Sequence, residues 1–102
     1  MIKRYATGDG AMASTFSMDG GNNCIKDIQI HLSAVGTGTL TIKTNAAKDS
    51  KYDTLMYTRD MTGVTDLFLS DLDWTIASGD SLDFAWANAG TVTWGIVLGV
   101  KL

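Results

Sequence analysis

The sequence predicts an all-β fold, a single antiparallel β-sandwich of about seven or eight strands, and two observations indicate it. All eleven acidic residues are Asp and none is Glu, and Asp favours turns and caps whereas Glu is a good helix former. Runs rich in Thr, Val, Ile and aromatic residues alternate between polar and apolar positions, which is typical of half-buried strands. The chain also has no Pro, so Gly, Asn and Asp must make its turns.

The chain is predicted to be one domain preceded by an N-terminal arm. Its 102 residues are enough to remove roughly two-thirds of the unfolded surface from water. Residues 1–23 are rich in Gly, Ala, Ser and Asn, and only residues 13–18 resemble a strand, so this segment is interpreted as the arm. Residues 24–102 then form the sandwich domain.

The first strands of the sandwich are predicted over residues 24–32 and 39–45, because both runs alternate with a period of two. The turn at residues 35–38 lies between them, and a hairpin is the simplest way to pair them. The apolar positions expected to face the core are Ile28, Ile30, Leu32, Leu40 and Ile42.

The middle of the chain is predicted to contain three shorter strands. A polar loop over residues 45–53 leads into the first strand, and Arg59 to Gly63 make the following turn. In each of these strands the apolar residues share one face: Leu55 with Tyr57, Leu67 with Leu69, and Leu72 with Trp74 and Ile76.

The last two strands, over residues 81–87 and 91–102, are predicted to form a hairpin through Asn88 to Gly90, where Gly supplies a positive φ at low cost. Alternation places Trp86 and Trp94 on apolar faces of these strands. We interpret both tryptophans as core residues rather than as a binding platform.

The opposite face of the final strand is shallow and uncharged until Lys101, because it consists of Thr93, Gly95, Val97 and Gly99. Gly within a strand often marks close approach of another backbone or a ligand. Gly95, Val97 and Gly99 are therefore the candidate subunit interface. The alternative is a central strand whose outer face tolerates small residues.

The sequence contains no catalytic signature, and it predicts a protein that is not an enzyme and binds no cofactor and no metal. The sole histidine, His31, lies on the polar side of a strand without a nucleophile motif. His31 and Cys24 together cannot furnish a closed zinc site. Cys24 is expected to be a half-buried residue at the start of a strand, since no cationic cluster lowers its pKa.

Four aspartates near one another in sequence, Asp71, Asp73, Asp80 and Asp83, are the strongest candidates for chemistry. A calcium site or a glycosidase pair is conceivable there. We favour structural roles in turns, because every acidic residue of the chain is an Asp.

The formal net charge of −3 disfavours nucleic acid as a partner, because phosphate contacts need clustered Lys and Arg. No apolar run approaches the roughly 20 residues of a membrane helix, so no membrane partner is expected. Residues 1–21 lack the apolar region of a signal peptide, which indicates synthesis and folding in a cytoplasm.

Four stretches within residues 38–102 carry a resemblance to known proteins: TGTLTIKT, YDTLMYTRDMTGVTDLFLS, IASGDSLDFAWA and GIVLGVKL. They resemble a class of small virion proteins of tailed bacteriophages. That resemblance implies a jelly-roll-like sandwich, made in the bacterial host cytoplasm, that decorates or cements a capsid by binding the major capsid protein, as a homotrimer. It also implies that the arm, with Lys3, Arg4 and Tyr5, contacts a partner subunit.

Three alternatives stay open at this point. An immunoglobulin-like sandwich would show the same alternation, since strand order does not follow from it. A carbohydrate- or receptor-binding module of a phage tail or fibre would need an exposed aromatic platform, for which Trp74, Tyr52 and Tyr57 are candidates. A small hydrolase would need a functional acidic pair.

Overall fold

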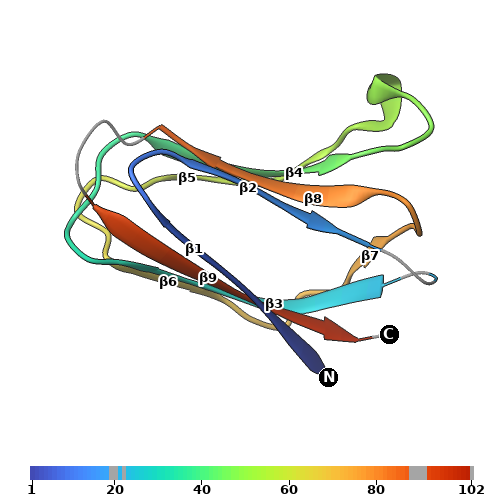
Figure 1. Ribbon diagram of the computed structural model, residues 1–102, viewed down its shortest axis with the longest axis horizontal. Coiled ribbons are helices and arrows are strands. Elements are labelled where there is room, and N and C mark those ends of the chain that lie inside the picture. The colour runs from blue at the N-terminus through green and yellow to red at the C-terminus, as the bar shows by residue number, and fades with distance from the viewer. Residues whose placement is uncertain (19–20, 22, 88–91, 102) are drawn as a thin grey trace.

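The computed structural model describes residues 1–18, 21, 23–87 and 92–101, and folds into two facing antiparallel sheets (Figure 1). One short 3-10 helix, η1, lies between two strands of the same sheet. In chain order the elements are β1 (Ile2–Asp9), β2 (Met12–Ser17), β3 (Asn23–Leu32), β4 (Thr39–Asn45), η1 (Ser50–Tyr52), β5 (Leu55–Asp60), β6 (Asp66–Leu69), β7 (Trp74–Ile76), β8 (Ser81–Trp86) and β9 (Thr93–Lys101).

The strand order is that of a jelly roll. Sheet A has the order β1-β9-β3-β6, with β7 also pairing with β3, and sheet B has the order β2-β8-β4-β5. The chain crosses from one sheet to the other at most connections, which produces the double Greek key of a jelly roll. The prediction of an all-β, jelly-roll-like antiparallel sandwich is therefore confirmed.

Two predicted hairpins are wrong. The strands at residues 24–32 and 39–45 lie in opposite sheets, where β3 pairs with β9 and β4 pairs with β8. The strands predicted over residues 81–87 and 91–102 correspond to β8 and β9, which are likewise separated between sheet B and sheet A. The turn expected at residues 88–90 lies outside the described residues. Alternation reports which face of a strand is buried, but it carries no information about which strand lies alongside.

The N-terminal segment differs from the expected arm, because β1 and β2 are built into the two sheets. β1 pairs with β9 over eight residues, from Ile2 opposite Val100 to Asp9 opposite Thr93. β2 lies where the short strand was expected and pairs with β8. β1 has a weak apolar signal because Gly8 occupies an inward position: a Cβ there would lie 2.6 Å from Trp94 Cζ2. The tryptophan ring fills space that a side chain of β1 would otherwise take.

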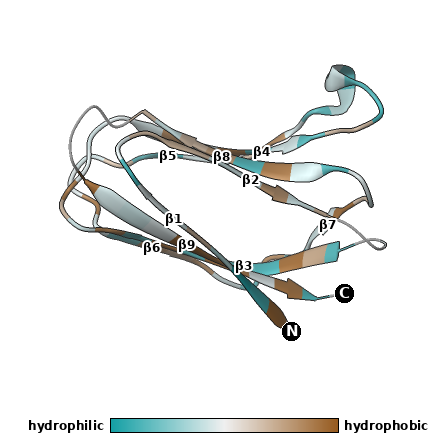
Figure 2. Ribbon diagram, in the orientation of Figure 1, coloured by the Kyte–Doolittle hydropathy of each residue, from teal (hydrophilic) through white to brown (hydrophobic). Residues whose placement is uncertain are grey.

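Both tryptophans belong to the core, as predicted, but they reach it from opposite sheets. The indole N–H of Trp86 donates to the carbonyl of Thr37 at 2.8 Å, and that of Trp94 donates to the carbonyl of Gly10 at 3.2 Å. Each buried indole thus has the hydrogen-bond partner that it needs away from water. Hydrophobic segments alternate along strands of both sheets (Figure 2).

Candidate functional site

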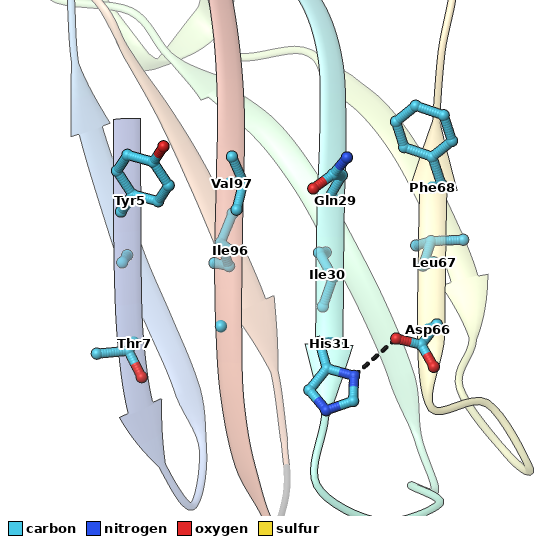
Figure 3. A pocket seen from close by; sticks show the side chains of 12 residues that line it. Tyr5, Thr7, Gln29, Ile30, His31, Asp66, Leu67, Phe68, Ile96 and Val97 are labelled. Atoms are coloured by element: carbon cyan, nitrogen blue, oxygen red, sulfur yellow. Dashed lines mark hydrogen bonds and ion pairs between the residues drawn. The ribbon is translucent and has the colours of Figure 1, made fainter. Parts of the chain in front are cut away.

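The outer face of sheet A carries a row of uncharged side chains across four strands, three of them apolar and one the amide of Gln29. The ladder places Tyr5 of β1 opposite Val97 of β9, Val97 opposite Gln29 of β3, and Gln29 opposite Phe68 of β6. Figure 3 shows these side chains on neighbouring strands. Tyr5 is 71% exposed and Phe68 is 60% exposed, so two aromatic rings stand at the ends of this row.

A second row lies next to the first and is polar. The register aligns Thr7, Gly95, His31 and Asp66 across the same four strands. Because Gly95 has no side chain, the protein surface is recessed between Thr7 and His31 in this row. The two rows together line a groove of about 690 Å³. We call it the sheet A groove, in which Gly95 and Val97 of β9 form the floor. Tyr5 and Phe68 are its aromatic walls (Figure 3).

An ion pair borders the groove on one side. Lys3 Nζ lies 3.2 Å from Asp27 Oδ1, and the register places Lys3 and Asp27 on either side of Gly99. A Cβ at Gly99 would collide with the Asp27 carboxylate. Gly99 is therefore small because Asp27 lies over it, and it is covered within the chain itself.

A histidine–carboxylate pair occupies the other side. His31 Nδ1 lies 2.6 Å from Asp66 Oδ1, and both side chains are exposed. The hydrogen bond from His31 lowers the pKa of Asp66, and a second one from Thr65 lowers it further. Asp66 is thus ionised at neutral pH, and because an ionised carboxylate only accepts, Nδ1 carries the proton. The carboxylate of Asp66 lies at this end of the groove.

The sequence suggested two separate sites, a subunit interface on the last strand and a partner-binding N-terminal arm. The structure brings most of their residues together on one face of sheet A. Gly95 and Val97 line the groove, and the pairing of β1 with β9 adds Tyr5 to it. Lys3 stands over Gly99 on the same face. Arg4 points the other way: its guanidinium carbon lies 5.3 Å from the centre of the Phe16 ring, and Nη1 donates to the carbonyl of Ser17 at 2.6 Å.

The sequence alone did not point to Phe68 and Asp66, which line the groove from β6. Phe68 and Asp66 occupy positions of β6 that alternation assigns to the outer face, and the large apolar side chain at Phe68 was the available signal. An exposed Phe between two polar outward positions is unusual enough to mark a surface. Pairing with β3 is what brings it level with Val97.

The four aspartates do not form a common site. Asp80 accepts a hydrogen bond from the Ala47 backbone and Asp83 accepts one from Thr15, while Asp71 lies in a turn with φ 56°. Among the described residues, no group of three or more His, Cys or acidic side chains could hold a metal ion.

Asp73 accepts from Cys24 Sγ at 3.0 Å and from Lys26 Nζ at 3.0 Å. The bond from Cys24, followed by that from Lys26, lowers the pKa of Asp73. The same hydrogen bond raises the pKa of the Cys24 thiol, and burial adds to the effect. A raised pKa makes the thiolate scarcer, so this thiol is less reactive than an ordinary cysteine.

The candidate aromatic platform is also dispersed. Trp74 and Tyr57 are partly buried against the core from β7 and β5, in opposite sheets, whereas Tyr52 belongs to η1. These rings cannot form one flat surface.

Within the described part of the chain, no helix is long and apolar enough to cross a membrane.

Acid is expected to destabilise the fold through Asp66 and Asp73, whose pKa values are lowered in the folded state. Such a group contributes stability above its unfolded pKa of about 3.9, and that contribution is lost as the pH falls through the folded value. Thermal unfolding followed by circular dichroism from neutral to strongly acidic pH measures this loss. Asp66→Asn should make the melting temperature less dependent on pH below about 4, and a parallel fall for both chains would contradict the assignment.

No protein-family model and no curated protein matches this sequence. Among solved structures, the fold is similar to the Drosophila NLP core, a nucleoplasmin core, with a TM-score of 0.54 and 16% identity over 97% of this chain and 99% of that one. The crystal structure of that core is described as giving insight into pentamer formation and histone binding. This comparison contradicts the predicted function of a phage structural protein. It contradicts both the capsid decoration protein and the alternative, a carbohydrate- or receptor-binding module of a tail or fibre. At this identity the likeness shows the fold: the chain is a jelly-roll sandwich of the kind seen in that core.

Proposed function

We propose that this protein is the non-enzymatic subunit of a homo-oligomer, in which the sheet A groove is buried against a second copy. The observation that carries the proposal is the mostly apolar row Tyr5, Val97, Gln29 and Phe68 on the outer face of sheet A, with an exposed aromatic ring at each end. Single exposed apolar residues are ordinary, but a contiguous apolar patch on a soluble protein marks an interaction surface.

The composition of the row is that of an interface centre. Tyr and Phe are enriched in the buried cores of protein interfaces, where charged residues are depleted. The only non-aromatic members of the row are Val97 and Gln29, and the charged pairs Lys3–Asp27 and His31–Asp66 lie on either side of it. An uncharged centre with a charged rim is therefore built by the register of four strands.

A ring of five subunits is the assembly that the fold comparison supports, since the similar core is described as a pentamer. The comparison does not support the trimer that the phage resemblance implied, so we propose a pentamer in its place. A five-membered ring requires a heterologous interface, in which two different surfaces of each subunit meet. The sheet A groove would supply one of them.

Phe68→Asp is expected to convert the assembly to monomers, because it replaces one aromatic wall of the groove with a carboxylate that would be buried beside Asp66. Light scattering coupled to size-exclusion chromatography should give wild-type protein five times the 10.9 kDa mass of one chain. The control is Val35→Asp, which introduces the same charge at a 62% exposed residue outside the groove. A monomeric wild-type protein at high concentration would overturn the proposal.

Binding of a basic protein is a second candidate function. The chain carries a net charge of −3, which favours cationic partners, and the similar core is described in connection with histone binding. Titration of labelled core histones, followed by fluorescence anisotropy at low and at physiological salt, tests it. We expect binding that weakens with salt, and no binding at low salt would reject this candidate.

A further inference from the structure

The segment between β4 and β5 projects from the body of the sandwich and carries η1 at its end (Figure 1). We call residues 46–55 the β4–β5 projection. Tyr52, in η1, is 61% exposed, and Leu55 at the start of β5 is exposed as well. The projection therefore presents a second set of exposed apolar side chains, separate from the groove.

The projection is held by its own hydrogen bonds. Asp49 Oδ1 accepts from the Lys51 backbone N–H at 2.8 Å and caps η1. Asp53 Oδ1 accepts from the Ala46 N–H at 2.8 Å, and Asp80, from the β7–β8 connection, accepts from the Ala47 N–H at 3.0 Å. A segment ordered in this way loses little conformational entropy when it docks.

The projection carries side chains of both charges. The carboxylates of Asp49 and Asp53 are turned onto backbone N–H groups. Lys48 and Lys51 are exposed and have no ion-pair partner within the described residues. The projection thus presents an aromatic ring beside two lysine ammonium groups, while Asp49 and Asp53 keep their negative charge and make its net charge zero.

The sheet A groove has the complementary features. Its walls, Tyr5 and Phe68, stand three strand spacings apart, which is about 14 Å at roughly 4.8 Å per spacing. The width of η1 is comparable to this spacing, since a helix is about 10–12 Å across with its side chains. Asp66, ionised because its pKa is lowered, lies at the rim where a lysine of the projection can reach it.

We infer that the β4–β5 projection of one subunit docks into the sheet A groove of the next, with Tyr52 against the apolar row and Lys51 facing Asp66. This inference rests on the proposed function, because it requires the groove to be a subunit interface. Each subunit then offers a groove on one side and a projection on the other. That head-to-tail contact is the heterologous kind from which closed rings are built.

Charge exchange between Lys51 and Asp66 tests the contact, with sedimentation equilibrium as the measurement. Lys51→Glu and Asp66→Lys should each raise the subunit dissociation constant about tenfold or more, and the double variant K51E/D66K should recover most of the lost affinity. Lys43→Glu, which makes the same charge change on the exposed outer face of sheet B, is the matched control and should leave assembly unchanged. Circular dichroism confirms that each variant is folded.

Mixing experiments test the head-to-tail geometry. Tyr52→Ser removes the ring from the projection and leaves the groove intact, whereas Phe68→Asp spoils the groove and leaves the projection intact. Each variant alone should be monomeric, and an equal mixture should form one-to-one dimers and no larger species, because only one productive contact is available. Wild-type assembly of both Tyr52→Ser and Lys51→Glu, with Phe68→Asp monomeric, would overturn this inference and leave the proposed function standing. Wild-type assembly of Phe68→Asp would overturn the proposed function itself.

Discussion

Replacing Trp86 with Ala is expected to lower the free energy of unfolding by about 3–5 kcal/mol, the range for large aromatic truncations in a core. Trp86 is buried in sheet B, where its strand neighbours are Met12 and Leu40. The substitution leaves a cavity between the sheets. It also leaves the Thr37 carbonyl without the indole N–H that donates to it at 2.8 Å, which adds to the loss.

Urea unfolding followed by far-ultraviolet circular dichroism measures this effect, in the Phe68→Asp background so that subunit association does not contribute. Trp74→Ala is the matched control, since Trp74 is only half-buried on the short strand β7. Trp74→Ala should lower the free energy of unfolding by clearly less than Trp86→Ala does. A loss below about 0.5 kcal/mol for Trp86→Ala, within the range of ordinary surface substitutions, would show that the two sheets close around the gap or that Trp86 is not a core residue.

Replacing Gly36 with Ala is expected to destabilise the fold by about 1–3 kcal/mol through overpacking. A Cβ at Gly36 would lie 2.6 Å from Trp86 Cζ2 and 3.3 Å from Leu32 Cδ1. The Trp86 ring is buried and its N–H is bonded to Thr37, so it cannot move aside easily. The added methyl group must displace either the ring or the connection between β3 and β4.

Gly95→Ala is the control for this substitution, because a Cβ at Gly95 meets no atom closer than 4.0 Å. In the Phe68→Asp background, Gly95→Ala should change the free energy of unfolding by less than about 0.5 kcal/mol. A smaller ring should relieve the clash, so Gly36→Ala combined with Trp86→Phe should cost less than the sum of the two single losses. Additive losses would show that Gly36 is not limited by Trp86.

Much of the strand content and of the core could be predicted from the sequence, because burial leaves a period-two record along each strand. Ile28, Ile30 and Leu32 face the core as predicted, and so do both tryptophans. The pattern fails in β1, where the inward positions are Arg4, Ala6 and Gly8. An edge strand buries less, and Gly8 yields its space to Trp94, so no apolar alternation is left to detect.

The candidate site could be predicted only in part. The glycine-valine face of the last strand indicated a covered surface, and Gly95 and Val97 line the groove. For Gly99 the physical reason is different, because Asp27 of the same chain covers it. The walls of the groove come from β1 and β6, which no local pattern places beside β9 and β3.

By itself the sequence determined the all-β class, the buried side of most strands and the absence of a recognisable catalytic motif, because these depend on residue type and on spacing along the chain. Tertiary structure alone decided that Tyr5, Val97, Gln29 and Phe68 form one row, since they are brought level by ladders between strands far apart in sequence. A one-residue shift in the register of any of these strands would turn its member of the row to the other face of the sheet. The jelly-roll order, and with it the sheet A groove, is therefore a consequence of long-range pairing between strands whose local patterns are alike.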